Sequence, residues 1–373
     1  MTWSLQNLKT AAAAFAVALA LAFALALASG PASAQQTAPA PGPEEAIGGA
    51  VPGASLGTDS DTDFWREIRR GAGGSAQQPH ELGGVLIQSE GETWRSVRNG
   101  PLSTYGVWLM AASVAGLALF FALRGRIAIE HGLSGVTIER FKAVERFGHW
   151  LTAGTFIVLA ITGLNMLYGR YILIPVIGKE AFATITMAGK WLHNWVAFGF
   201  MAGLVLIFVM WVAHNIPNRT DLAWLAKGGG LFTKGVHPPS RKFNAGQKII
   251  FWATILGGVS LSLSGWALLD PFTTTMFGKT FAVVNLVGFN LPTDLTLMEE
   301  QQFAQVWHTI VSLVMIAIIL AHIYIGSIGM QGAFAAMGSG HVDLNWAKEH
   351  HGLWVEEEQA KGAVPGGRPQ PAE

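Results

Sequence analysis

Five long apolar stretches constrain the fold of this chain more than any other feature of its sequence. They lie at about 105–123, 148–168, 191–213, 248–269 and 305–326. Each is close to the roughly 20 residues that cross a hydrocarbon core as an α-helix. Hydrophobic residues make up 51% of the 373 residues and charged residues only 13%, about half of the share in an ordinary soluble domain. The sequence therefore predicts an all-α membrane protein whose helices contact membrane lipid.

The N-terminus predicts export of the segment that follows it. Residues 1–34 contain one lysine, an apolar run and then Ala32-Ser33-Ala34, the pattern of a cleaved secretory signal peptide. An uncleaved signal anchor is the alternative, because the run is almost long enough to span a bilayer. Residues 35–102 are rich in proline, glycine, alanine and glutamine without a sustained period, which predicts a mostly irregular periplasmic extension. Within it, the stretches around Trp65 and Trp94 look more structured, since each combines an aromatic residue with basic residues at similar spacing.

Loop charges predict the orientation of the spans. With residue 35 outside the cytoplasm, the loops at 124–146 and 214–247 are cytoplasmic. Their basic residues are Arg124, Arg126, Arg140, Lys142, Arg146, Arg219, Lys227, Lys234, Arg241 and Lys242. The outer loops carry Arg170, Lys179, Lys190 and Lys279. The positive-inside rule therefore agrees with the signal peptide, and residues 331–373 are expected on the cytoplasmic side of a bacterial inner membrane.

Composition excludes several functions. The chain has no cysteine, which excludes disulfides, cysteine-ligated iron–sulfur clusters, thiolate zinc sites and covalently attached c-type haem. Lysine plus arginine equals aspartate plus glutamate at 24 each, so no electrostatic feature points to nucleic acid as a partner.

Four of the 11 histidines lie within the apolar spans: His149, His193, His308 and His322. A polar ring in hydrocarbon needs a partner, because its burial alone is costly. The topology places His149 near the cytoplasmic face and both His193 and His308 near the outer face. Fourteen residues carry the chain from His308 to His322, about 21 Å and close to four helical turns, so His322 reaches the depth of His149 on nearly the same helix face. The histidines thus form two level pairs.

Two imidazoles that face each other across a helical bundle, in a protein without cysteine, are the axial ligands of a b-type haem. We therefore expect two haems b, one with outer iron ligands His193 and His308, the other with cytoplasmic-side ligands His149 and His322. Such irons have no open position, which favours electron transfer over oxygen activation. Zinc or copper is the metal alternative, but those ions prefer three or four converging ligands.

Other polar residues near the spans have two interpretations each. His214 competes for the cytoplasmic-side pair, but Asn215 and Pro217 indicate that the helix ends there. The cluster Arg140, Lys142 and Arg146 serves either haem propionates or positive-inside bias. The remaining histidines are expected to be solvated: His80, His131, His237, His341, His350 and His351.

The stretch RKFNAGQKIIFW opens the fourth span. Asn244 and Gln247 have the spacing of a capping box, which would explain both residues structurally. The functional alternative is that Asn244, Gly246 and Gln247 offer polar groups to a quinone head at the cytoplasmic face.

Several motifs together resemble a known family. The segments ERFKAVERFGHWLTAGTFIVLAITGL, KWLHNWVAFGF, HNIPNRTDLAWL, KFNAGQKIIFW and WAKEHHGLW are similar, in order and spacing, to the gamma subunits of respiratory formate dehydrogenases, which are membrane cytochromes b. The resemblance covers about residues 138–354. It implies a four-helix bundle over 138–330 with two haems b at the histidine pairs named above and a quinone site beside the cytoplasmic-side haem. The span at 103–124 is an additional N-terminal transmembrane helix that departs from this pattern.

The family also implies partners. A periplasmic catalytic alpha subunit would oxidise formate, and an iron–sulfur beta subunit would pass the electrons to this chain, which would reduce quinone. One alternative is the same module serving another periplasmic dehydrogenase, such as a nickel–iron hydrogenase. A second is a haem-free transporter or anchor whose histidines relay protons.

Overall fold

The computed structural model describes residues 91–271 and 273–362, so the predicted signal peptide, most of the extension at 35–102, including Trp65, and His80 lie outside the described residues. Five described helices are long and apolar enough to cross a membrane, which confirms the predicted spans. They are α4 (Ser103–Arg124), α5 (Ala143–Ile172), α6 (Ile174–Trp211), α8 (Ala245–Leu269) and α10 (Leu297–Tyr324). The shorter helices and strands are α3 (Gly91–Val97), η2 (Arg98–Leu102), β1 (Thr137–Glu139), η3 (Val212–His214), α7 (Arg219–Ala226), η4 (Gly228–Gly230), α9 (Phe277–Asn285), η5 (Ile325–Gly329), α11 (Ala335–Gly338), β2 (His341–Asp343) and α12 (Leu344–Ala360).

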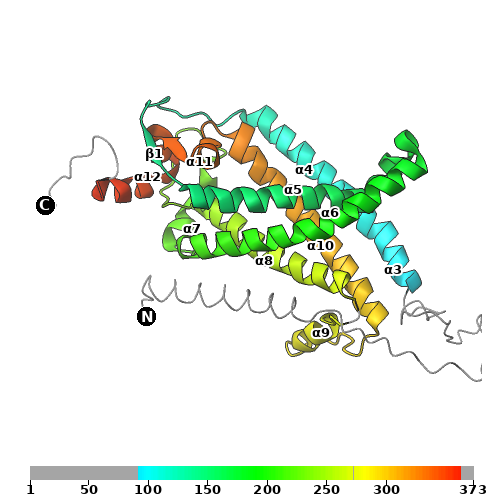
Figure 1. Ribbon diagram of the computed structural model, residues 1–373. Helices are drawn as coiled ribbons and strands as arrows, with labels where there is room; N and C mark the ends of the chain where they lie inside the picture. Colours follow the sequence, from blue (N-terminus) through cyan, green and yellow to red (C-terminus); the bar gives the residue numbers. More distant parts are fainter. Residues whose placement is uncertain (1–90, 272, 363–373) are drawn as a thin grey trace, which may run out of the picture.

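Helical structure begins earlier than the predicted boundary at 103. The helix α3 starts at Gly91 and continues through the π-type turn η2 into α4 (Figure 1). Pro101 cannot donate a backbone hydrogen bond, and the chain accommodates it with a widened turn and a non-helical Gly100. Residues 91–102, which include the stretch around Trp94 that was expected to be more structured, are therefore a helical lead into the first span.

The predicted four-helix bundle with one added helix is confirmed. The helix α5 packs along α6, α8 packs along α10, and α6 contacts α8, while α4 lies against α10. Small residues bring the helices close: a Cβ atom on Gly203 of α6 would lie 3.0 Å from the backbone of Thr152 on α5. On the added helix, a Cβ atom on Gly106 would lie 2.7 Å from Leu313 of α10. The contact at Gly203 requires glycine because the neighbouring atoms belong to the backbone of α5.

One end of the bundle is closed by α9, beside the start of α10 (Figure 1). Glu300 of α10 is 4% exposed, and its carboxylate accepts hydrogen bonds from the backbone N–H groups of Met276, Phe277 and Gly278 at 2.7–3.0 Å. These are free donors at the first turn of α9, so one carboxylate caps that helix and attaches it to the bundle.

A folded cap covers the opposite end (Figure 1). It consists of residues 127–142, 215–244 and 330–361. The strands β1 and β2 pair antiparallel with Ile138 opposite Val342, and Glu349 of α12 accepts hydrogen bonds from the backbone N–H groups of Glu130 and His131. The C-terminal segment, at least to residue 361, is thus part of a compact unit.

The prediction that the loop and tail histidines are solvated is wrong for two residues of α12, namely His350, whose Nε2 atom is buried, and His351. The side chain of His351 is 1% exposed, packs against Trp346 and Trp354, and its Nδ1 donates a hydrogen bond to the Arg241 carbonyl at 2.8 Å. Pairing of β1 with β2 brings α12 back onto the loops at 127–142 and 215–244, an event that no local pattern in a polar tail reveals. By contrast, His341 is exposed as expected.

Burial determines the charge state of two adjacent histidines in α12. It lowers the pKa of His350 to about 4 and holds the pKa of His351 well below the ordinary 6.5. Between about pH 6.5 and pH 4, an unfolded cap therefore binds protons that the folded cap does not bind. The free energy of unfolding the cap must fall as the pH falls through this window.

Hydrogen exchange of the α12 amides, corrected for the intrinsic effect of pH, is expected to quicken as the pH is lowered from 6.5 to 4. The variant His350→Gln should weaken this dependence because its side chain does not titrate. As a control, His341→Gln at an exposed position should leave the dependence unchanged. Exchange independent of pH in this window would contradict the role of the buried histidines.

Candidate functional site

The structure brings the four intramembrane histidines together in the two predicted pairs. His193 of α6 faces His308 of α10, with ring centroids 6.3 Å apart and ring planes 65° apart. His149 of α5 faces His322 of α10, with centroids 6.2 Å apart and planes 56° apart. We call these the outer pair and the inner pair. The helix α10 contributes one ring to each.

Both spacings suit one metal ion between two rings. A metal–imidazole bond is about 2.0–2.1 Å long. The centre of a five-membered ring with bonds of about 1.35 Å lies about 1.1 Å from each ring atom. Two rings on opposite sides of one metal would therefore have centroids about 6.3 Å apart, which matches both observed distances. Among the described residues, no group of three or more His, Asp or Glu side chains could hold a metal, so the pairs fit axial ligation of a haem better than a zinc site.

Two hydroxyls that the sequence analysis missed hold the outer pair. The Oγ1 atom of Thr162 on α5 lies 2.8 Å from Nδ1 of His193, and the Oγ atom of Ser264 on α8 lies 3.0 Å from Nδ1 of His308. Metal-bound histidines commonly anchor their second ring nitrogen in this way. With Nδ1 occupied, Nε2 is the nitrogen available to iron in both rings.

A glycine follows each hydroxyl and makes room for the imidazole. A Cβ atom on Gly163 would lie 3.6 Å from Cε1 of His193, and a Cβ atom on Gly265 would lie 3.3 Å from Cε1 of His308. The rings of the outer pair therefore lie directly against the backbone of a neighbouring helix.

His149 of the inner pair lacks this anchor. Nδ1 of His149 is buried and has no hydrogen-bond partner in residues 91–271 and 273–362. The ring instead meets the edge of Trp150, whose indole N–H donates to the Met337 carbonyl in the cap at 2.8 Å. The inner pair thus lies where the bundle meets the cap.

The basic cluster before α5 is built into the cap. Arg140 is 3% exposed among Phe141, Trp346 and Trp354, and it donates to the Lys242 carbonyl at 2.6 Å. Its Nε and Nη1 atoms have no partner in the part of the chain that the structure describes. Burial lowers the pKa of this guanidinium to about 9, which leaves it charged at neutral pH.

The other two basic residues of this cluster differ in exposure. Lys142 is exposed, whereas Arg146 is half-buried and donates a hydrogen bond to the Gly338 carbonyl. Contact of this cluster with haem propionates stays a prediction.

The residues considered for quinone form the capping box of α8. Asn244 Oδ1 accepts from the Gln247 N–H at 2.9 Å, and Gln247 Oε1 accepts from the Asn244 N–H at 3.1 Å. Gly246 lies against Trp224, since a Cβ atom on it would be 2.9 Å from that indole. The structural explanation therefore accounts for both side-chain oxygens, and the quinone role stays a prediction.

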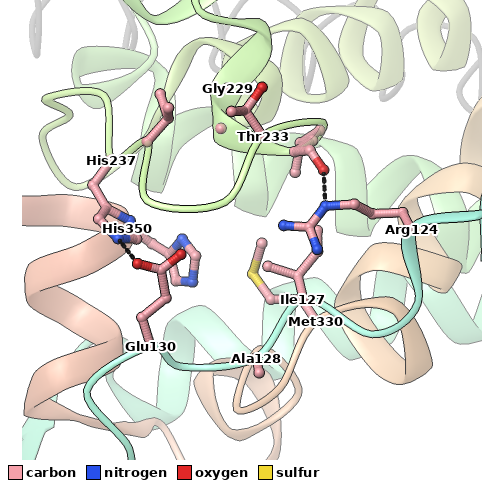
Figure 2. A pocket seen from close by; sticks show the side chains of 12 residues that line it. Arg124, Ile127, Ala128, Glu130, Gly229, Thr233, His237, Met330 and His350 are labelled. Carbon is pink, nitrogen blue, oxygen red and sulfur yellow. Dashed lines mark hydrogen bonds and ion pairs between the residues drawn. The ribbon is translucent and has the colours of Figure 1, made fainter.

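A separate polar pocket lies in the cap (Figure 2). Arg124, Glu130, His237, Met330 and His350 are among the side chains that line it. In the wall of this pocket, Oε2 of Glu130 lies 3.0 Å from Nε2 of His237. These residues come from helices and loops that are distant in sequence, so the sequence analysis did not identify this pocket.

Comparisons with known proteins cover the part of the chain that contains both histidine pairs. Residues 140–340, which include α5 to α11, match the prokaryotic cytochrome b561 family. The chain is 30% identical over 222 residues to the cytochrome b556(fdo) subunit of formate dehydrogenase from Escherichia coli K12, covering 59% of this chain and 93% of that protein. It is 26% identical over 222 residues to the nitrate-inducible cytochrome b556(Fdn) subunit of the same strain, covering 59% and 91% of the two chains. The helix α4 lies outside the family match.

Proposed function

Because this chain belongs to the prokaryotic cytochrome b561 family, we propose that it binds two haems b and carries electrons from a periplasmic formate dehydrogenase to quinone. It is an integral membrane cytochrome b of the electron-transfer type, similar to formate dehydrogenase subunits. The observation that carries the two-haem proposal is the pairing of four histidines at two levels with centroids 6.2 and 6.3 Å apart.

Each histidine has one role in this proposal. His193 and His308 would hold the iron of the outer haem, and His149 and His322 would hold that of the inner haem. When bound, the two haems would supply one-electron redox chemistry, and the four histidines would leave no iron position open for oxygen. The helix α10 sets their separation, because its two ligands are about 21 Å apart along the axis.

Formate oxidation belongs to partner subunits in this proposal. The chain has no cysteine to ligate an iron–sulfur cluster, so a beta subunit with such clusters would deliver electrons and an alpha subunit would oxidise formate. Quinone would be reduced near the inner pair, with Asn244, Gly246 and Gln247 at its site. The nearby guanidinium of Arg140, 3.5 Å from Gln247 Oε1, supports a polar site there.

The proposed orientation puts the cap in the cytoplasm and α9 in the periplasm. The basic residues Arg140, Lys142, Arg146 and Lys242 all lie at the cap end of the bundle, as the positive-inside rule requires. The outer pair then faces the electron donor and the inner pair faces the quinone. Exposed apolar side chains such as Ile161 and Leu256 suit contact with lipid in a bacterial inner membrane.

Haem analysis of the purified chain tests this proposal. We expect two haems b per chain, a b-type reduced-minus-oxidised spectrum, and reduction of both haems by formate in the intact complex. A chain without iron would overturn the proposal in favour of a transporter or anchor. Haems reduced by hydrogen but not by formate, with hydrogenase subunits copurifying, would identify a different dehydrogenase partner.

A further inference from the structure

The outer pair is held by the same arrangement twice. Thr162-Gly163 on α5 contacts His193, and Ser264-Gly265 on α8 contacts His308. In each case the hydroxyl meets Nδ1 and the glycine lies against Cε1 of the same ring. Two different helices therefore present a hydroxyl followed by a glycine to the two rings of one pair.

The neighbours of the hydroxyls determine where the ring protons are. Thr162 Oγ1 lies 2.8 Å from the Val158 carbonyl, and Ser264 Oγ lies 2.9 Å from the Ser260 carbonyl. A carbonyl only accepts, so each hydroxyl donates its single proton to the carbonyl one turn earlier in its own helix. The imidazole must then carry its proton on Nδ1 and donate it to the hydroxyl oxygen, with the Leu159 carbonyl as a further acceptor for His193 and the Leu261 carbonyl as a further acceptor for His308. Both outer rings are thereby held as the Nδ1–H tautomer, with the lone pair on Nε2.

This hydrogen bond has an electronic consequence for a bound iron. An imidazole that donates its N–H to an acceptor is a more basic ligand, because the remaining ring carries more electron density. A more basic axial ligand stabilises ferric over ferrous iron and so lowers the reduction potential. The inner pair differs, since Nδ1 of His149 is buried without an acceptor among the described residues.

We propose that Thr162 and Ser264 are positioning residues that hold His193 and His308 through Nδ1 and lower the reduction potential of the outer haem relative to the inner haem. This inference rests on the proposed two-haem function. Electrons that enter on the periplasmic side would then move toward a higher reduction potential on the quinone side, because hydroxyls on helices α5 and α8 lower the potential of the outer haem.

Potentiometric titration of the full-length chain carrying Thr162→Val and Ser264→Ala tests the proposal. We expect two haems to remain and only the outer haem to shift, toward a higher potential. The expected size is about a tenfold change in its ratio of oxidised to reduced forms at a fixed potential, which equals about 59 mV for a one-electron couple. The component that is missing in His308→Ala identifies the outer haem. The variant Thr162→Ser with Ser264→Thr keeps both hydroxyls and should restore the original potential.

Matched controls separate the imidazole contact from the helix back-bond. Thr155 on α5 donates to the Leu151 carbonyl at 2.6 Å, and Ser262 on α8 donates to the Gly258 carbonyl at 2.7 Å, with no histidine in either hydrogen bond. Thr155→Val and Ser262→Ala should therefore leave both potentials unchanged.

Three outcomes would overturn the inference. The first is that Thr162→Val with Ser264→Ala leaves both potentials unchanged, and the second is that it shifts the potentials of both haems equally. The third is that this variant loses the outer haem and that Thr162→Ser with Ser264→Thr loses it as well. Loss of the outer haem that the hydroxyl-retaining variant reverses would support the positioning role. A wild-type chain with fewer than two haems would instead contradict the proposed function, so the two failures are distinguishable.

Discussion

Replacing His308 with alanine is expected to leave one haem b per chain and to abolish quinone reduction by formate. The outer pair would keep only His193, and a single imidazole leaves the iron without its second axial ligand. Haem extraction and the reduced-minus-oxidised spectrum measure the loss directly. Free imidazole added to the variant should restore part of the missing spectrum, because the alanine leaves room for a small ligand beside Gly265.

The matched control for this variant is His214→Ala. His214 is exposed at the end of η3, beyond the last turn of α6, and its ring stacks on Phe243 in the cap. Two haems should remain in this control. A His308→Ala chain that retains the complete two-haem spectrum would show that the outer pair does not ligate haem, and loss of a haem in His214→Ala would assign the inner ligand differently.

Replacing Lys248 with methionine is expected to destabilise the cap by about 3–5 kcal/mol, the usual effect of breaking a buried ion pair. Lys248 of α8 is 5% exposed, and its Nζ lies 2.8 Å from Asp221 Oδ2 and 3.0 Å from the Ile216 carbonyl. The variant leaves the Asp221 carboxylate buried without its cation. The free energy of unfolding in mixed detergent micelles, and hydrogen exchange of the α7 amides, would measure the effect.

Two further variants test the buried pair. Lys361→Met removes a cation from an exposed pair with Glu358 and should leave unfolding unchanged. Lys248→Met with Asp221→Asn should recover part of the loss, since a neutral amide avoids the unpaired charge and its oxygen can still accept the Asn218 N–H that caps α7. If Lys248→Met unfolds like the wild-type chain, the pair does not hold α7 to α8.

The helical spans were predictable because the bilayer leaves few alternatives. A chain in hydrocarbon must satisfy its backbone groups internally, so about 20 apolar residues form one helix. Helix geometry then converts a sequence separation into a depth, and for this reason the histidine pairs could be named before any tertiary contact was known. The capping box of Asn244 and Gln247 was equally local, and the structure contains it.

The cap was not predictable from local patterns. Its strand pair joins Ile138 to Val342, and its buried carboxylate Glu349 serves the backbone of Glu130 and His131. The segments that meet there are polar, short and far apart in sequence, so no hydrophobic period marks them. Burial of His351 follows from that assembly and from nothing in its neighbouring residues.

The sequence by itself determined the membrane class, the number of spans and the level of each intramembrane histidine, because length and rise per residue are local quantities. Only the tertiary structure decided which helix faces meet. It brought Thr162 to His193 and Ser264 to His308, left His149 Nδ1 without an acceptor among the described residues, and folded the C-terminal segment over the bundle. The physical reason is that hydrogen bonds of 2.8–3.0 Å between side chains on different helices depend on helix rotation and packing, which no periodicity within one helix specifies.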